Sequence, residues 1–98
     1  MLDTIQHVFA SITDRKANPK EGSYTNRLLT MGEDEILKKI GEESVEVILA
    51  AKAQGDERLV SELADLTFHC LVLLAQRGLS PANIAAELER RHAPAAGK

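Results

Sequence analysis

Apolar residues recur every three or four positions along most of the chain, which is the period of an amphipathic helix. The first such stretch is formed by Leu2, Ile5, Val8, Phe9 and Ile12. It predicts a helix that ends near Asp14, followed by a loop over residues 15–22. Pro19 and Gly22 lie in this loop, and both residue types interrupt helices. Ser23 is a suitable cap for a short second helix, and Gly32 is suited to end it.

Two long helices follow, over residues 33–54 and 57–77. Gly55 is expected to stop the first helix, and Asp56 is expected to cap the second. The connection between them is so short that they should form an antiparallel hairpin. Ser80 and Pro81 are a typical cap and first-turn pair, and they predict a last helix that ends near residue 91.

The pattern therefore predicts one all-α domain over residues 1–91 and a disordered tail over residues 92–98. The apolar fraction of 44% with only 3% aromatic residues favours an aliphatic helical core. The stretch from Leu63 to Ala75 is more apolar than a chain of 98 residues can cover with one hairpin. We expect two hairpins to form a four-helix-bundle core by homodimerisation.

Charge and composition restrict the classes of partner. A formal net charge of −3 gives no electrostatic reason to expect nucleic-acid or membrane binding. The near-apolar run from Leu66 to Ala75 is shorter than a membrane span requires. Cys70 is interpreted as a small core residue, and a single cysteine excludes an internal disulfide. We expect a soluble cytoplasmic protein.

The most informative polar feature is a pair of carboxylate clusters on the two long helices. Glu42, Glu43 and Glu46 form the first, and Glu62 and Asp65 form the second. Spacings of three or four residues place each cluster on one helical face. An antiparallel hairpin brings the two faces together. Crowded carboxylate oxygens are the ligands that Mg²⁺ prefers, so the sequence predicts a magnesium site.

A solvated helix face is the alternative interpretation of the first cluster. Lys38 and Lys39 lie four residues before Glu42 and Glu43 and are able to pair with them. The second cluster is harder to explain in this way, because it borders an apolar helix and unpaired buried carboxylates are costly.

His69 lies one turn beyond Asp65 and leaves two interpretations open. It is either a hydrogen-bonded core histidine or a residue that supports a metal ligand.

These motifs resemble the all-α nucleotide pyrophosphatase superfamily. The closer resemblance is to the phosphoribosyl-ATP pyrophosphatases of histidine biosynthesis, and it covers residues 3–91. It is carried by PKEGSYTNRLL (19–29), KKIGEESVEVILAAK (38–52) and SELADLTFHCLVLLAQRGLS (61–80). The Ser23-Tyr24-Thr25 segment and the spacing from Asp65 to His69 are its most specific parts.

The resemblance implies Mg²⁺-dependent hydrolysis of 1-(5-phosphoribosyl)-ATP, a homodimer and a set of site residues. The implied metal ligands are Glu43, Glu46, Glu62 and Asp65. The candidate groups that activate water are Glu42 and Glu46. The candidate substrate contacts are Ser23, Tyr24, Thr25, Arg27, Lys38 and Lys39.

Two other functions stay open at this point. One is a general pyrophosphatase for dUTP or other nucleoside triphosphates on the same scaffold. The other is a helical dimer without catalytic activity, whose acidic face binds a basic partner or a structural metal ion.

Overall fold

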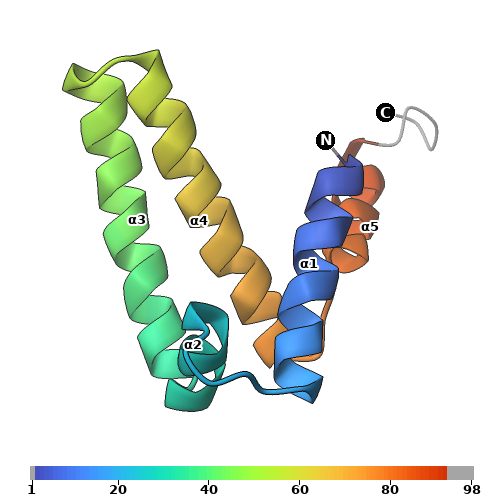
Figure 1. Ribbon diagram of the computed structural model, residues 1–98. Coiled ribbons are helices and arrows are strands. Elements are labelled where there is room, and N and C mark those ends of the chain that lie inside the picture. Colours follow the sequence, from blue (N-terminus) through green and yellow to red (C-terminus); the bar gives the residue numbers. More distant parts are fainter. Residues whose placement is uncertain (1, 93–98) are drawn as a thin grey trace.

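A computed structural model describes residues 2–92, and within this range the chain folds into five helices without a strand (Figure 1). Their bounds are α1 Leu2–Ala17, α2 Tyr24–Met31, α3 Glu33–Ala53, α4 Asp56–Gln76 and α5 Pro81–His92. The prediction of an all-α fold is confirmed. Residues 93–98, most of the predicted disordered tail, lie outside the described range, while His92 is the last residue of α5.

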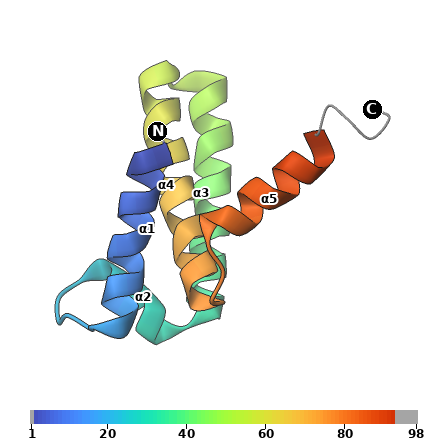
Figure 2. The same cartoon turned by 90° about the vertical axis from the view of Figure 1, so that its right-hand side faces the viewer.

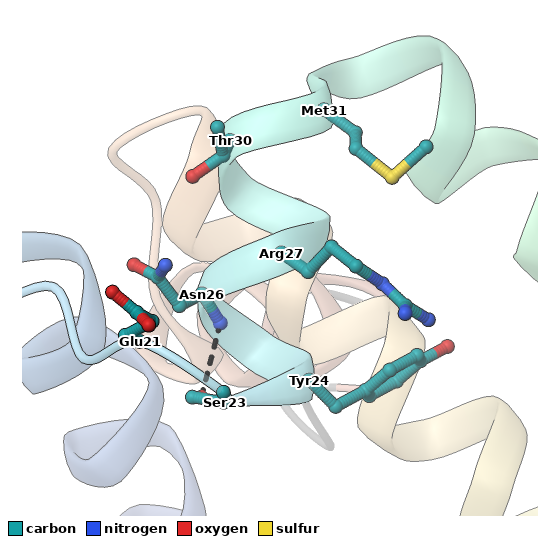
Figure 3. A pocket seen from close by; sticks show the side chains of 8 residues that line it. Glu21, Ser23, Tyr24, Asn26, Arg27, Thr30 and Met31 are labelled. Carbon is teal, nitrogen blue, oxygen red and sulfur yellow. Dashed lines mark hydrogen bonds between the residues drawn. The ribbon is translucent and has the colours of Figure 1, made fainter.

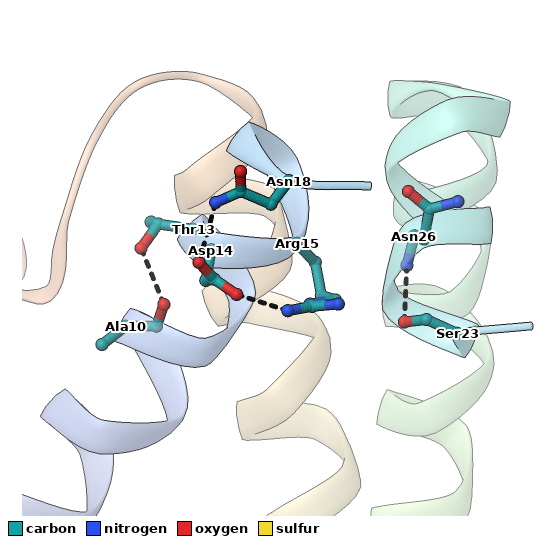
Figure 4. Close-up of polar contacts among 7 residues, drawn as sticks. All are labelled: Ala10, Thr13, Asp14, Arg15, Asn18, Ser23 and Asn26. Carbon is teal, nitrogen blue, oxygen red and sulfur yellow. Dashed lines mark hydrogen bonds and ion pairs between the residues drawn. The ribbon is translucent and has the colours of Figure 1, made fainter. Parts of the chain in front are cut away.

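The end of α1 differs from the sequence prediction. The helix continues past Asp14 to Ala17, and its last turn contains Arg15 and Lys16. Cations near a helix C-terminus interact favourably with the helix dipole, which accounts for the extra turn. The Asp14 carboxylate pairs with Arg15 (Figure 4). It also accepts a hydrogen bond from the Asn18 side-chain amide, with 3.0 Å between Nδ2 and Oδ1.

The start of α2 is capped as predicted. The Ser23 hydroxyl oxygen accepts a hydrogen bond from the backbone N–H of Asn26 at 3.1 Å (Figure 4). This bond satisfies one of the N–H groups that the first helical turn leaves without a partner. At the other end of α2, the backbone N–H of Gly32 donates a hydrogen bond to the Leu28 carbonyl oxygen, and the helix ends there.

The turn between α3 and α4 consists of Gln54 and Gly55. Gly55 has a φ of 90°, a conformation that residues with a side chain rarely adopt. Asp56 is the first residue of α4 and makes no capping bond, because Gly55 occupies the cap position. The expected antiparallel hairpin is present, and α3 and α4 make the most extensive helix contact among the described residues (Figure 1).

The core lies at one end of this hairpin, where α1 and α2 pack against it. Its buried members are Ile12, Leu28, Ile36, Leu71, Val72 and Ala75. Two long-range polar contacts close the same end. The Lys16 ammonium donates to the Ala75 carbonyl at 2.8 Å, and the Arg77 guanidinium donates two bonds to the Glu33 carboxylate at 2.6 and 2.7 Å.

The other half of the hairpin has no cover within the described chain. Apolar side chains there are exposed: Val45, Ile48, Leu49, Val60 and Leu63. The buried apolar residues of α4, Leu71, Val72 and Ala75, all lie in its C-terminal half. Helix α4 is long enough to cross a membrane, and an 18-residue window of it reaches the mean hydropathy of a membrane span, with 28% of that window buried. Length and hydropathy alone therefore do not distinguish a membrane span from a helix that packs against protein.

Helix α5 contacts α1 and extends away from the hairpin (Figure 2). Ser80 precedes it as predicted, and the Ser80 N–H donates to the Asn83 side chain at 2.9 Å. No residue of α5 is buried. The carboxylate-bearing parts of α3 and α4 thus take their positions from the hairpin and from α1 and α2.

We expect Ile36→Ala to lower the free energy of unfolding by about 3 kcal/mol, because it removes three buried carbons from a closely packed core. The Ile36 side chain is 0% exposed. Urea denaturation followed by circular dichroism measures the change. Ile84→Ala on α5 is the matched control, since Ile84 is exposed and its truncation should cost well under 1 kcal/mol. Equal losses in both variants would contradict the assigned core.

Candidate functional site

The hairpin brings the two carboxylate clusters together near the middle of α3 and the first half of α4. Glu43, Glu62 and Asp65 each place one carboxylate oxygen within 4.8 Å of the other two. They differ in exposure, because Glu62 is 4% exposed whereas Asp65 lies at the surface. Three oxygens this close form a donor set of the kind that holds a hard divalent cation.

Glu42 and Glu46 lie next to Glu43, Glu62 and Asp65 but are not part of this group of three close carboxylates. Together with Glu43, Arg58, Glu62 and Asp65 they line an open hollow of about 540 Å³. The Glu42 carboxylate also pairs with Lys39, at 3.6 Å from the ammonium nitrogen. The alternative that lysines pair with the first cluster is thus observed for Glu42, while Glu43 faces the other helix.

Burial and like charges disfavour the ionised form of Glu43 at the centre of the site. Burial raises the pKa of the Glu43 carboxyl, and the neighbouring Asp65 carboxylate raises it further. A raised pKa in the folded state means that folding disfavours ionised Glu43, so this residue lowers stability as the pH rises through its pKa. A bound cation would remove this penalty.

One cation already contacts the cluster. The Arg58 guanidinium lies one turn before Glu62 on α4 and is 2.9 Å from its carboxylate. The buried carboxylate of Glu62 is therefore paired, as buried charges usually are.

His69 connects Asp65 to α2. Its ring is 6% exposed, and Nδ1 lies 2.8 Å from the backbone carbonyl oxygen of Asp65. A carbonyl oxygen only accepts, so Nδ1 donates, and in the neutral ring Nε2 accepts from the Tyr24 hydroxyl at 2.8 Å. His69 is thus a hydrogen-bonded buried histidine that also holds the backbone of a candidate ligand.

The Tyr24 ring sits between two further groups. Phe68 stacks on it with ring centroids 6.4 Å apart, and the Arg27 guanidinium lies 5.5 Å from its centroid. Figure 3 shows Arg27 extending over Tyr24 at the edge of a pocket of about 390 Å³. The pocket is lined by Glu21, Gly22, Ser23, Tyr24, Asn26, Arg27, Thr30 and Met31. The Tyr24 bond to His69 links this pocket to Asp65.

The remaining predicted substrate contacts are dispersed. Thr25 lines a second hollow of about 490 Å³ beside the first, together with Arg15 and Lys20. Lys38 is exposed, and neither of these hollows includes it. Ser23 already uses its hydroxyl to cap α2. Arg15 and Lys20 are not among the predicted substrate contacts, although both line this hollow. Arg15 was expected in a loop but lies in the last turn of α1.

The fold and site together define a class: small all-helical proteins whose central hairpin presents a carboxylate cluster suited to a divalent cation. Comparison with known proteins is more specific. The family model for phosphoribosyl-ATP pyrophosphohydrolase matches residues 5–92.

Named relatives agree with the family model over most of the chain. Phosphoribosyl-ATP pyrophosphatase of Lactiplantibacillus plantarum is 52% identical over 90 residues, which cover 92% of this chain and 85% of that protein. The Methanocella arvoryzae protein of the same name is 53% identical over 93 residues, covering 93% and 98%. The Listeria welshimeri protein of this name is 54% identical over 87 residues, covering 89% and 84%.

The chain therefore belongs to the phosphoribosyl-ATP pyrophosphohydrolase family, and the resemblance seen in its motifs is confirmed. The prediction that it is a hydrolase is confirmed with it. The roles of the individual site residues stay predictions.

We expect Tyr24→Phe to destabilise the protein by about 1 kcal/mol, because the buried His69 Nε2 would lose its hydrogen-bond donor. Urea denaturation measures this change. Ser44→Ala is the control, since the Ser44 hydroxyl bonds only to Ile40 on its own helix and its removal should cost less. Wild-type stability of Tyr24→Phe would show that the bond does not hold α2 against α4.

Proposed function

We propose that this chain hydrolyses 1-(5-phosphoribosyl)-ATP to 1-(5-phosphoribosyl)-AMP and pyrophosphate, the second step of L-histidine biosynthesis. The observation that carries the proposal is the close group of Glu43, Glu62 and Asp65 in a chain of this family. The relatives are named as phosphoribosyl-ATP pyrophosphatases, which indicates the substrate. The carboxylates indicate that the substrate would be bound through a metal ion.

The donor set fits Mg²⁺. It consists of carboxylate oxygens alone. Burial and, after it, the Asp65 carboxylate raise the Glu43 pKa, and a divalent cation would favour the ionised form that both disfavour. In this proposal Glu43, Glu62 and Asp65 would hold the ion, together with Glu46, which lines the same hollow. When bound, the ion supplies charge stabilisation at phosphate oxygens and lowers the pKa of a coordinated water.

The protein's own groups then handle the proton and the substrate. A carboxylate oxygen of Glu42 or Glu46 that the ion does not use would accept the proton of the attacking water. Arg27 and Lys39 contact phosphate oxygens, and the pocket beside Tyr24 receives another part of the nucleotide. Ser23 supports this pocket by capping α2.

We expect rapid pyrophosphate release from phosphoribosyl-ATP in Mg²⁺ and none in excess EDTA. Asp65→Asn should lower kcat/KM by about 100-fold or more, since it weakens the ligand set. Asp56→Asn, the same change at the start of the same helix, is the matched control and should retain activity. A coupled pyrophosphate assay gives these values.

The same assay distinguishes the alternatives. Release from dUTP, dCTP, ITP or ATP in place of phosphoribosyl-ATP would favour a general nucleotide pyrophosphatase with the same metal site. Release from none of them would favour the non-catalytic helical module.

We also propose that two copies form a homodimer through the uncovered half of the hairpin, completing a four-helix bundle. Val60 is 66% exposed and Ile48 is 60% exposed on neighbouring helices. The radius of gyration of 15.4 Å exceeds the roughly 13 Å typical of a compact chain of this length. Charged residues of α4 flank this apolar face, so a second protein surface suits it better than lipid does.

We expect the wild-type protein to sediment at twice its 10.7 kDa mass at micromolar concentration. Ile48→Lys should raise the dissociation constant by about 100-fold or more, because it buries a charge in an apolar contact. Ile84→Lys, at another exposed position, on α5, should leave the mass unchanged. A wild-type protein that sediments as a single chain would contradict the dimer.

A further inference from the structure

Arg58 is an exposed residue of α4 whose side chain contacts the carboxylate site. Its guanidinium contacts the buried Glu62 carboxylate at 2.9 Å, and the same side chain lines the hollow formed by the carboxylates. Glu62 is also one of the three residues whose oxygens meet within 4.8 Å. Arg58 and a metal ion would therefore claim the same carboxylate.

The two cations compete electrostatically for Glu62. An arginine side chain stays protonated at all working pH values, so its charge cannot be lost when a metal ion arrives. A divalent ion on Glu62 would lie a few ångströms from the guanidinium, and their repulsion in a partly buried site weakens the Arg58–Glu62 contact. Metal binding therefore favours displacement of the guanidinium.

Arg58 is able to move, whereas Glu62 is not. The Arg58 side chain is 57% exposed and the Glu62 side chain is 5% exposed. Ion pairs with one exposed partner are weakly held, and an arginine side chain has enough rotatable bonds to swing its head group across the hollow without a backbone change.

We propose that Arg58 is an exchangeable counter-ion of the site. In the metal-free protein its guanidinium neutralises Glu62. When Mg²⁺ takes this carboxylate, the released guanidinium binds non-bridging phosphate oxygens of the metal-bound nucleotide, for which its planar fork is well suited. This inference rests on the proposed function, because it takes the metal site and a phosphate-bearing substrate as given.

Metal binding without substrate tests the first half. We expect Mg²⁺ titrated calorimetrically into Arg58→Gln to bind about tenfold more tightly than to the wild-type protein, because a competing charge is removed. Arg58→Lys keeps the charge and should stay near wild type. Arg90→Gln is the matched control, since Arg90 also pairs with a glutamate of its own helix, on α5. Unchanged or weaker Mg²⁺ binding by Arg58→Gln would overturn the exchange.

Pyrophosphate binding tests the second half. In saturating Mg²⁺ we expect Arg58→Gln to bind pyrophosphate about tenfold more weakly than wild type, with Arg58→Lys between them. Equal affinity in the wild type and Arg58→Gln would overturn the transfer to phosphate.

These outcomes are separable from failure of the proposed function. A wild-type protein that binds no Mg²⁺ would overturn the metal site and the exchange together. If both affinity shifts occur but phosphoribosyl-ATP is not hydrolysed, the exchange is supported and the proposed reaction is rejected.

Discussion

The antiparallel packing of α3 against α4 holds together carboxylates that would otherwise move apart. The turn of Gln54 and Gly55 fixes which residues of the two helices lie opposite each other, and it sets Glu43 beside Glu62 and Asp65. This arrangement is stabilised by packing in another part of the molecule. The buried core around Ile36 and Val72 lies at the end of the hairpin where α1 and α2 cover it, away from the turn.

Two kinds of unsatisfied surface meet on the remaining half of the hairpin. Carboxylates crowd one side of it, and exposed apolar side chains such as Ile48 and Val60 occupy another. Each is costly in a single chain, the first through like-charge repulsion and the second through contact with water. A cation and a second copy of the hairpin would relieve both costs, so in the proposed dimer the same region would serve binding and assembly, and stability would be coupled to activity.

The sequence predicted helix ends best where a local residue decides them. Ser23 and Gly32 bound α2 as expected, because capping depends on neighbours in the chain. The end of α1 was missed, since no breaker precedes Pro19 and the cations after Asp14 favour another turn. Asp56 was misassigned as a cap because either it or Gly55 suits that position.

Long-range contacts were beyond sequence reasoning. Periodicity indicated that Glu62 and Asp65 share a face and that the hairpin brings Glu43 near them. It gave no indication that Tyr24 would reach His69 across 45 residues, or that Arg77 would pair with Glu33. The apolar excess of the stretch from Leu63 to Ala75 indicated that one chain cannot cover it, but the pattern did not tell which of its residues the same chain leaves exposed, such as Leu63.

The contact between Tyr24 and His69 has an optical consequence. Tyr24 is the chain's one tyrosine, and the sequence contains no tryptophan. Its phenol group is hydrogen-bonded to the imidazole that holds Asp65, and its ring lies beside Arg27 in the adjacent pocket. Near-ultraviolet absorption and intrinsic fluorescence of this protein therefore arise chiefly from the Tyr24 ring. This residue contacts His69, which is bonded to Asp65, and it also lines the pocket. Tyr24 is therefore a built-in spectroscopic probe, and a ligand in the adjacent pocket would change its signal.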